Sequence, residues 1–134
     1  MRATKIVTCF ITNENKILLL KRSDEVKSMK GLWAGVSGII EKDEPPLARA
    51  KREIFEEVGL HEGQIKLLKS EKEMRIVSPQ YKNHEWLVFP FLFGAENQTI
   101  KLNWENSDYR WISIDEIKNF ETVPSLDKVL LNLL

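Results

Sequence analysis

Three glutamates, Glu53, Glu56 and Glu57, form the group of side chains in this sequence that is best suited to chemistry. If their segment is helical, at about 100° per residue, they share one side of the helix with Arg49 and Arg52. Glu53 and Glu57 are then a like-charged pair four residues apart, which costs roughly a few tenths of a kcal/mol unless a cation lies between them. Mg²⁺ prefers oxygen ligands and binds substrate phosphates as well, so the pattern indicates a divalent metal site. A solvated helix face with arginine–glutamate ion pairs is the alternative interpretation.

The helix that must carry these glutamates has a recognisable beginning and end. Pro45 and Pro46 suit a first helical turn, where a missing backbone N–H costs nothing, and Gly59 suits a left-handed stop. Apolar residues gather on the other side of the helix, with two further residues flanking them: Leu47, Ala50, Ile54 and Val58, flanked by Ala48 and Phe55. We therefore expect that side to be buried and the glutamates to face solvent.

The segment from residue 38 to residue 60 resembles the signature of the Nudix hydrolases. The specified places of that signature are all filled at the expected spacing, by Gly38, Glu44, Arg52, Glu53, Ile54, Glu56, Glu57, Gly59 and Leu60. The resemblance implies that Glu53, Glu56 and Glu57 hold Mg²⁺, for which Mn²⁺ can substitute, and that the Gly38 carbonyl is a further ligand. A match at so many fixed positions is far more specific than a lone glycine motif.

The resemblance also implies roles in catalysis for Glu53, Glu57, Arg52 and Glu44. Arg52 can hold a neighbouring glutamate with its planar guanidinium, and Glu44 supports the metal site or positions the base. The general base is either a signature glutamate or a carboxylate from a distant loop. Outside the signature, three acids could serve, although their residue type favours an exposed surface position for each: Glu85, Glu96 and Glu105.

Nudix enzymes hydrolyse a diphosphate linkage in a nucleoside diphosphate-linked metabolite, so the expected substrate is a small nucleotide-like diphosphate. The implied classes are nucleoside triphosphates, oxidised nucleotides, ADP-ribose-like compounds and dinucleoside polyphosphates. Many nucleotide-sanitising relatives carry Pro-Gly-Gly where this chain has Val36-Ser37-Gly38, which weakens the case for an oxidised nucleotide. A ligand sensor on the same fold is the alternative. An isopentenyl diphosphate isomerase would need a catalytic cysteine, and Cys9 lies in an apolar strand pattern instead.

Aromatic side chains could stack on the base of such a substrate, because stacking tolerates any base. The candidates are Trp33, Tyr81, Trp86 and Trp104. We expect Trp33 to take this part, since it lies just ahead of Gly38 in a strand relieved by glycines. A position in the hydrophobic core is the alternative for each of them.

The composition places limits on partners and location. The 134 residues suit one domain, 1–134, and 43% hydrophobic with 30% charged residues is typical of a soluble globular protein. Lysine plus arginine equals aspartate plus glutamate at 20 each, so no bulk charge favours nucleic acid or membrane binding. Cys9 is the only cysteine, which excludes an internal disulfide and makes a reducing cytoplasm the default location.

The remaining segments predict strands and short helices. We expect a hairpin of 5–12 and 16–21, strands at 33–40, 85–93 and 109–112, one or two strands within 64–77, and a turn at 79–84. Ser113 with Glu116 predicts a capping box for a short helix to about Phe120. Ser125 should cap a terminal helix with a leucine-rich stripe, which leaves monomer and homodimer open. The pattern is α/β, and the resemblance sharpens it to the Nudix α/β/α sandwich around a mixed sheet.

Overall fold

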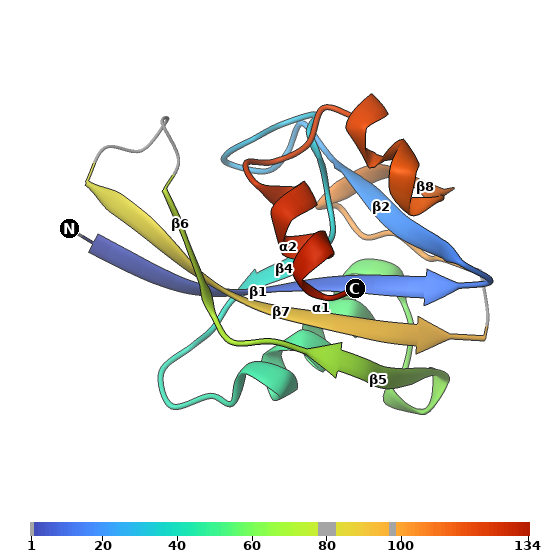
Figure 1. Ribbon diagram of the computed structural model, residues 1–134, viewed down its shortest axis with the longest axis horizontal. Coiled ribbons are helices and arrows are strands. Elements are labelled where there is room, and N and C mark those ends of the chain that lie inside the picture. The colour runs from blue at the N-terminus through green and yellow to red at the C-terminus, as the bar shows by residue number, and fades with distance from the viewer. Residues whose placement is uncertain (1, 78–82, 97–98) are drawn as a thin grey trace.

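One long strand, β1 (Arg2–Asn13), lies at the centre of the sheet in the computed structural model, which describes residues 2–77, 83–96 and 99–134. It pairs in parallel with β7 (His84–Ala95) along almost its whole length, and antiparallel with β4 (Val36–Ile39). At its end it turns back into β2 (Lys16–Arg22). The sheet is therefore mixed, as predicted (Figure 1).

The predicted hairpin between β1 and β2 is confirmed, with a two-residue loop. Thr12 pairs with Ile17 and Asn13 with Lys16, and the loop residues Glu14 and Asn15 have φ values of 50° and 67°. Positive φ at both loop positions matches the right-handed twist of the flanking strands.

Shorter strands extend the sheet on both sides. β2 pairs with β3 (Trp33–Ala34) and β8 (Asn106–Ile112), while β7 pairs with β5 (Ile65–Ser70) and β6 (Met74–Val77). The single strand predicted at 33–40 is thus two strands, separated at Gly35. At Gly35 the chain changes its pairing partner, because β3 pairs with β2 and β4 pairs with β1. A Cβ at Gly35 would lie 2.7 Å from the carbonyl oxygen of Cys9, so the backbone passes close to β1 at this point. The segment 64–77, predicted to hold one or two strands, holds two, β5 and β6. A short 3₁₀ helix, η1 (Glu62–Gln64), precedes them.

Pro90 lies inside β7 without breaking it. β5 ends and β6 begins opposite this residue, so the ladder on that side is interrupted. The Pro90 carbonyl accepts a hydrogen bond of 3.4 Å from the backbone of Glu71, within the interruption. Because the N and C=O of one strand residue point to the same side, the missing N–H of Pro90 also falls at the gap.

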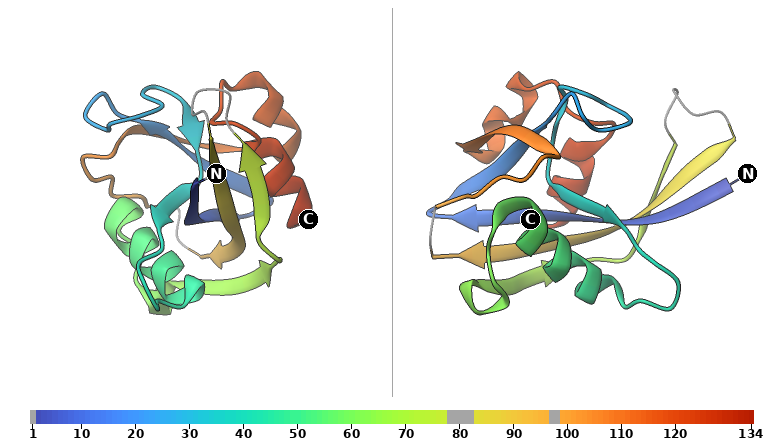
Figure 2. Two further views of the ribbon diagram at one scale, coloured as in Figure 1. Left: turned by 90° about the vertical axis from the view of Figure 1, so that its left-hand side faces the viewer. Right: turned by 180° about the vertical axis from the view of Figure 1, so that it is seen from behind.

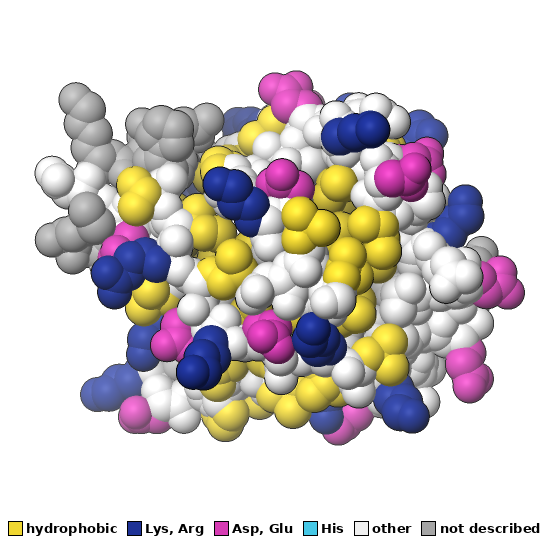
Figure 3. Space-filling model, viewed as in Figure 1, with side chains coloured by type: hydrophobic (Ala, Val, Ile, Leu, Met, Phe, Trp, Pro, Cys, Tyr) yellow, Lys and Arg dark blue, Asp and Glu magenta, His cyan; other side chains and the backbone are white. Residues whose placement is uncertain are grey.

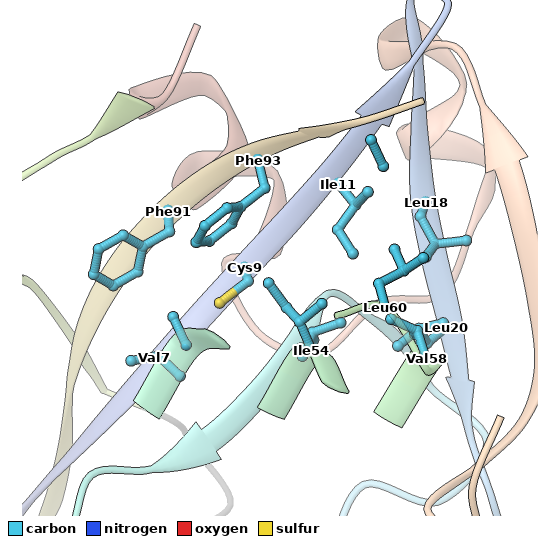
Figure 4. Close-up of a cluster of buried hydrophobic side chains, with 13 residues drawn as sticks. Val7, Cys9, Ile11, Leu18, Leu20, Ile54, Val58, Leu60, Phe91 and Phe93 are labelled. Atoms are coloured by element: carbon cyan, nitrogen blue, oxygen red, sulfur yellow. The ribbon is translucent and has the colours of Figure 1, made fainter. Parts of the chain in front are cut away.

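Helices cover the two faces of the sheet (Figure 2). α1 (Pro46–Val58) packs on one face, where its apolar side chains join those of β1, β2 and β7 in the first core cluster (Figure 4). α2 (Leu126–Asn132) and the 3₁₀ helix η2 (Ile114–Asn119) belong to the second cluster, on the other face. The α/β/α arrangement predicted from the resemblance is therefore confirmed.

The C-terminal predictions have mixed outcomes. The capping box is present, since Glu116 accepts hydrogen bonds from the Ser113 backbone and hydroxyl at 2.9 and 2.6 Å. The cap expected from Ser125 was wrong: its φ is 62° and its side chain makes no cap hydrogen bond. The predicted stripe is buried, as Leu126, Val129, Leu130 and Leu133.

Two further predictions concern surfaces. Leu131 and Leu134 are exposed, and hydrophobic side chains gather on the molecular face that carries α2 (Figure 3), but the choice between monomer and homodimer stays a prediction. No helix within the described ranges is long and apolar enough to cross a bilayer. Most of the turn predicted at 79–84 lies outside the described residues, because residues 78–82, Tyr81 among them, are not described. His84, the last residue of the predicted turn, is the first residue of β7.

Candidate active site

Helix α1 begins and ends where its sequence predicts. Pro45 is the N-cap in an extended conformation and Pro46 is the first helical residue. Gly59 ends the helix with φ 77°, and its N–H donates to the Phe55 carbonyl at 3.1 Å. These local features fix the position of every signature side chain along the helix.

The predicted buried apolar side of α1 is confirmed, but the prediction that its glutamates face solvent was wrong for Glu53 and Glu57. Ala50, Ile54 and Val58 are fully buried, but Glu53 and Glu57 are also buried, with exposed fractions of 7% and 3%. Phe55, expected beside the buried side, is half exposed and its ring lies against His61. The helical wheel gives directions around the axis, but it does not show that β4 and the loop before β8 cover the acidic side.

The buried glutamates meet a third carboxylate from a distant loop. One oxygen each from Glu53, Glu57 and Glu105 lie within 4.8 Å of one another. Asn106, the first residue of β8, donates from Nδ2 to Oε1 of Glu57 at 3.1 Å. Among the described residues, Oε2 of Glu57 is buried and has no hydrogen-bond partner. A buried acceptor facing other acceptors is the arrangement that a cation satisfies.

The cluster has perturbed acidities. Burial raises the pKa of Glu57 well above its ordinary value, and the charges of Glu105 and Glu53 raise it further, against the donation from Asn106. Burial also raises the pKa of Glu53, although the hydrogen bond from Arg49 opposes this. A divalent cation would offset these effects, because it favours the ionised carboxylates.

Arg49, outside the signature, is the cation that holds the buried acids. Its guanidinium is buried and donates to both oxygens of Glu44, at 2.6 and 3.0 Å, and to Oε2 of Glu53 at 2.9 Å. These hydrogen bonds hold the pKa of Glu44 below its ordinary value. Arg52 instead pairs with Glu56 at 3.1 Å on the exposed part of the helix. The arginine expected to orient the cluster therefore lies at its edge, while Arg49 makes the buried contacts.

Gly38 of β4 packs directly on the cluster. A Cβ at this position would lie 2.3 Å from the carboxyl carbon of Glu53, so a side chain here would displace that carboxylate. The requirement for glycine is thus one of space. Glu56 is exposed and lines the cavity beside the cluster, outside the group of three convergent carboxylates.

A cavity of about 510 Å³ opens beside the carboxylates. Its charged lining comes from α1, the end of β2 and two loops, and consists of Arg22, Glu41, Arg49, Glu53, Glu56 and Glu105. Its apolar lining comes from the sheet and the C-terminal segment and includes Ile6, Ile76, Trp86, Val88, Leu126 and Val129. The cavity therefore combines a charged part, rich in carboxylates, with an apolar part.

The aromatic and acidic candidates fall in different places. Trp33 packs edge-on against Phe120, with ring centroids 5.2 Å apart, and is not among the described cavity-lining residues, whereas Trp86 and Trp104 are. Glu85 forms an ion pair with Arg75 at 3.2 Å. Glu96 lies exposed at the end of β7, so Glu105 is the candidate that joins the cluster.

Cys9 is buried in the first core cluster, where its thiol lies among apolar side chains (Figure 4). Burial raises the pKa of this thiol, and the charges of Glu57 and Glu53 add to the effect. A reactive thiolate is disfavoured there, which argues against the isomerase alternative.

Two residues of the site were not singled out as functional in the sequence. Arg49 had one usable signal, its four-residue spacing to Glu53 on a helix. Asn106 had none, because nothing local shows that the start of β8 reaches the helix. The fit to a divalent cation rests on observations of this chain: the oxygen donors of Glu53, Glu57 and Glu105, and the unpartnered Oε2.

Comparisons with known proteins agree with this architecture. The model of the NUDIX domain matches residues 2–133. A dihydroneopterin triphosphate diphosphatase from Haemophilus influenzae is 26% identical over 96% of this chain and 87% of its own length. A nucleoside triphosphatase, NudI, from Escherichia coli is 26% identical over 97% of this chain and 96% of its own. The crystal structure of a MutT protein from Methanosarcina mazei Go1 superposes with a TM-score of 0.82 at 23% identity, covering 98% of this chain and 92% of that one. Because the NUDIX domain model covers almost the whole chain, the chain belongs to the Nudix hydrolase family.

Proposed function

We propose that this protein is a diphosphohydrolase that uses Mg²⁺ to cleave a diphosphate linkage in a triphosphate compound that also carries a flat heterocycle, such as a nucleoside triphosphate. The observation that carries the proposal is the convergence of Glu53, Glu57 and Glu105 within 4.8 Å beside a cavity with both charged and apolar lining. Two relatives of similar length are named for triphosphate substrates, which favours this class over dinucleotides and nucleotide sugars.

Each carboxylate has a part in this proposal. Glu53, Glu57 and Glu105 hold the metal, and Glu56 adds negative charge at the cavity wall. When bound, Mg²⁺ would neutralise charge on the diphosphate oxygens and make the attacking water more acidic. The carboxylate cluster also offers acceptors for the proton that this water loses. Arg49 fixes Glu53, while Glu44 fixes Arg49, so the acceptors keep their orientation.

The apolar part of the cavity binds the heterocycle in this proposal. Trp86 takes the stacking role first expected of Trp33, because Trp86 lies in the apolar part of the cavity lining, whereas Trp33 contacts Phe120. Trp104, which also lines the cavity, lies next to the carboxylate-bearing Glu105 in the chain. Loss of one stacked aromatic costs ~1–3 kcal/mol of binding. Trp86→Ala should therefore raise KM about tenfold, whereas Trp33→Ala should lower stability and leave KM close to that of the wild type.

The test is a substrate panel with a matched pair of variants. Wild type, Glu57→Gln and the surface control Glu62→Gln are incubated with nucleoside triphosphates, pterin triphosphates, oxidised nucleotides, ADP-ribose and dinucleoside polyphosphates, with Mg²⁺ or with EDTA. Mass spectrometry of the products identifies the broken bond. We expect Mg²⁺-dependent cleavage of a triphosphate by the wild type and Glu62→Gln, reduced at least 100-fold in Glu57→Gln. Metal-dependent ligand binding without any product would instead support the sensor alternative.

A further inference from the structure

Ser23 joins two loops that border the cavity. It follows β2 directly, is buried, and donates from Oγ to the Trp104 carbonyl at 2.7 Å. Its backbone N–H donates to the Glu105 carbonyl at 2.9 Å. The same Oγ accepts the N–H of Glu25 at 3.2 Å, so the hydroxyl uses both its donor and its acceptor capacity.

Both partners of this contact have further anchors. The guanidinium of Arg22, at the end of β2, donates to the Ser28 carbonyl at 3.2 and 3.1 Å. These hydrogen bonds connect the end of β2 with the loop that follows it. On the other side, Asn103 and Glu105 exchange two hydrogen bonds of 3.1 Å, from Nδ2 to Oε1 and from the backbone N–H to Oδ1. Ser23 therefore links two locally braced segments.

Glu105 needs such a link because of its surroundings. It lies in the turn immediately before β8, outside the ladder that β8 forms with β2. Its carboxylate approaches those of Glu53 and Glu57, and like charges repel one another. Without a fixed backbone the carboxylate would move away from the cluster, since among the described residues the Glu105 side chain accepts a hydrogen bond from Asn103 alone.

We propose that Ser23 is a positioning residue for Glu105 through its hydroxyl, which holds the Trp104 carbonyl beside the backbone hydrogen bond from Ser23 to the Glu105 carbonyl. Replacing Ser23 removes the hydroxyl contact and keeps the backbone one. The inference rests on the proposed function, because it treats Glu105 as a metal ligand. It adds Ser23, which lies outside the signature and directly after β2, to the residues that assemble the metal site. Partners of this kind typically change metal affinity ~10–100-fold when they are removed.

The test measures Mn²⁺ binding by calorimetry, with thermal denaturation in EDTA for each protein. The variants are Ser23→Ala, Ser23→Cys, Glu105→Gln and the two double variants. Ser113→Ala is the matched control, because it also removes a serine hydroxyl that donates at 2.6 Å, but far along the chain in the η2 capping box. Ser23→Cys keeps the size of the side chain and serves if Ser23→Ala does not fold.

We expect Ser23→Ala and Ser23→Cys to weaken Mn²⁺ binding about tenfold in the wild-type background and less than twofold in the Glu105→Gln background. Ser113→Ala should lower the melting temperature without changing the affinity. Equal losses in both backgrounds, or wild-type affinity in both Ser23 variants, would overturn the proposal. If the wild type itself binds no Mn²⁺, the proposed function fails first, which distinguishes the two failures.

Discussion

Replacing Glu57 by glutamine should stabilise the metal-free protein while removing its response to metal. Glu57 is 3% exposed, and Oε1 accepts the hydrogen bond from Asn106, which a glutamine oxygen can also accept. The new amide nitrogen would replace Oε2, the buried oxygen without a partner, and could donate to the neighbouring carboxylates. The substitution therefore keeps the shape of the side chain and removes its charge.

The magnitude follows from the distances within the cluster. Two unit charges 4.8 Å apart repel by about 3.5 kcal/mol at an effective dielectric constant of about 20. Glu57 faces both Glu53 and Glu105, but proton uptake by the cluster relieves part of the repulsion. We expect the free energy of unfolding of metal-free Glu57→Gln to rise by about 1–3 kcal/mol, and Tm by about 4–11 °C.

The assay is thermal and urea denaturation at pH 7.5, in EDTA and then in Mg²⁺. Ligand at 100 times Kd stabilises the wild type by about 2.7 kcal/mol, and Glu57→Gln should gain only a small part of this. The surface control Glu62→Gln should respond to metal as the wild type does. Two results would refute this reasoning. Metal-free Glu57→Gln could be less stable than the wild type, which would mean that the charge of Glu57 does not destabilise the fold. Alternatively, Mg²⁺ could stabilise Glu57→Gln as much as the wild type, which would mean that Glu57 is not a metal ligand.

Three further predictions concern the same cluster. Arg49→Met leaves buried carboxylates without their cation and should cost about 3–5 kcal/mol in urea denaturation, whereas Arg52→Met should cost less than about 1 kcal/mol; equal losses would contradict the contact network. Gly38→Ala should displace the Glu53 carboxylate and weaken Mn²⁺ binding at least about tenfold by calorimetry; unchanged affinity would contradict the packing. Burial raises the pKa of Glu53 and Glu57 in the folded, metal-free protein. The contribution of these two groups to stability should therefore be most favourable near and below pH 4.5, the ordinary carboxyl value. It should fall as the pH rises through their folded pKa values. Denaturation in EDTA at pH 5.5 and 8 measures this decline, which should shrink in Glu57→Gln.

The sequence predicted features that depend on a few neighbouring residues. Pro45 and Gly59 fix the ends of α1, and the spacing of Ser113 and Glu116 fixes the capping box, because each involves groups within one or two turns of backbone. The order of strands and helices indicated a mixed sheet, whereas the layers of helices on its two faces came from the resemblance. The long-range pairing of β1 with β7 leaves no local pattern. For the same local reasons, the sequence placed Glu53, Glu56 and Glu57 correctly on α1.

What the sequence did not reveal depends on the approach of distant segments. The wheel put Glu53 and Glu57 together but could not show that they are buried, because burial is decided by β4 and the turn before β8. It likewise put Arg49 and Arg52 on the same side without ranking them. Only the position of Glu44 ahead of the helix gives Arg49 its second partner. Glu105 was one of three equivalent acids in the sequence, and the fold alone distinguishes it.

These differences share a physical cause. A local reading assumes that charged side chains avoid burial, and most do. Here two core clusters, on either side of the sheet, supply the apolar burial that holds the fold together, while the side of α1 next to β4 carries buried carboxylates that oppose folding without a cation. Local rules are commonly broken at functional sites, with compensation from elsewhere in the molecule. The repulsion among these carboxylates destabilises the metal-free cluster and, for the same reason, strengthens its binding of a cation. The burial of charged side chains on one side of α1, where exposed ones are expected, is therefore itself an argument for the metal site.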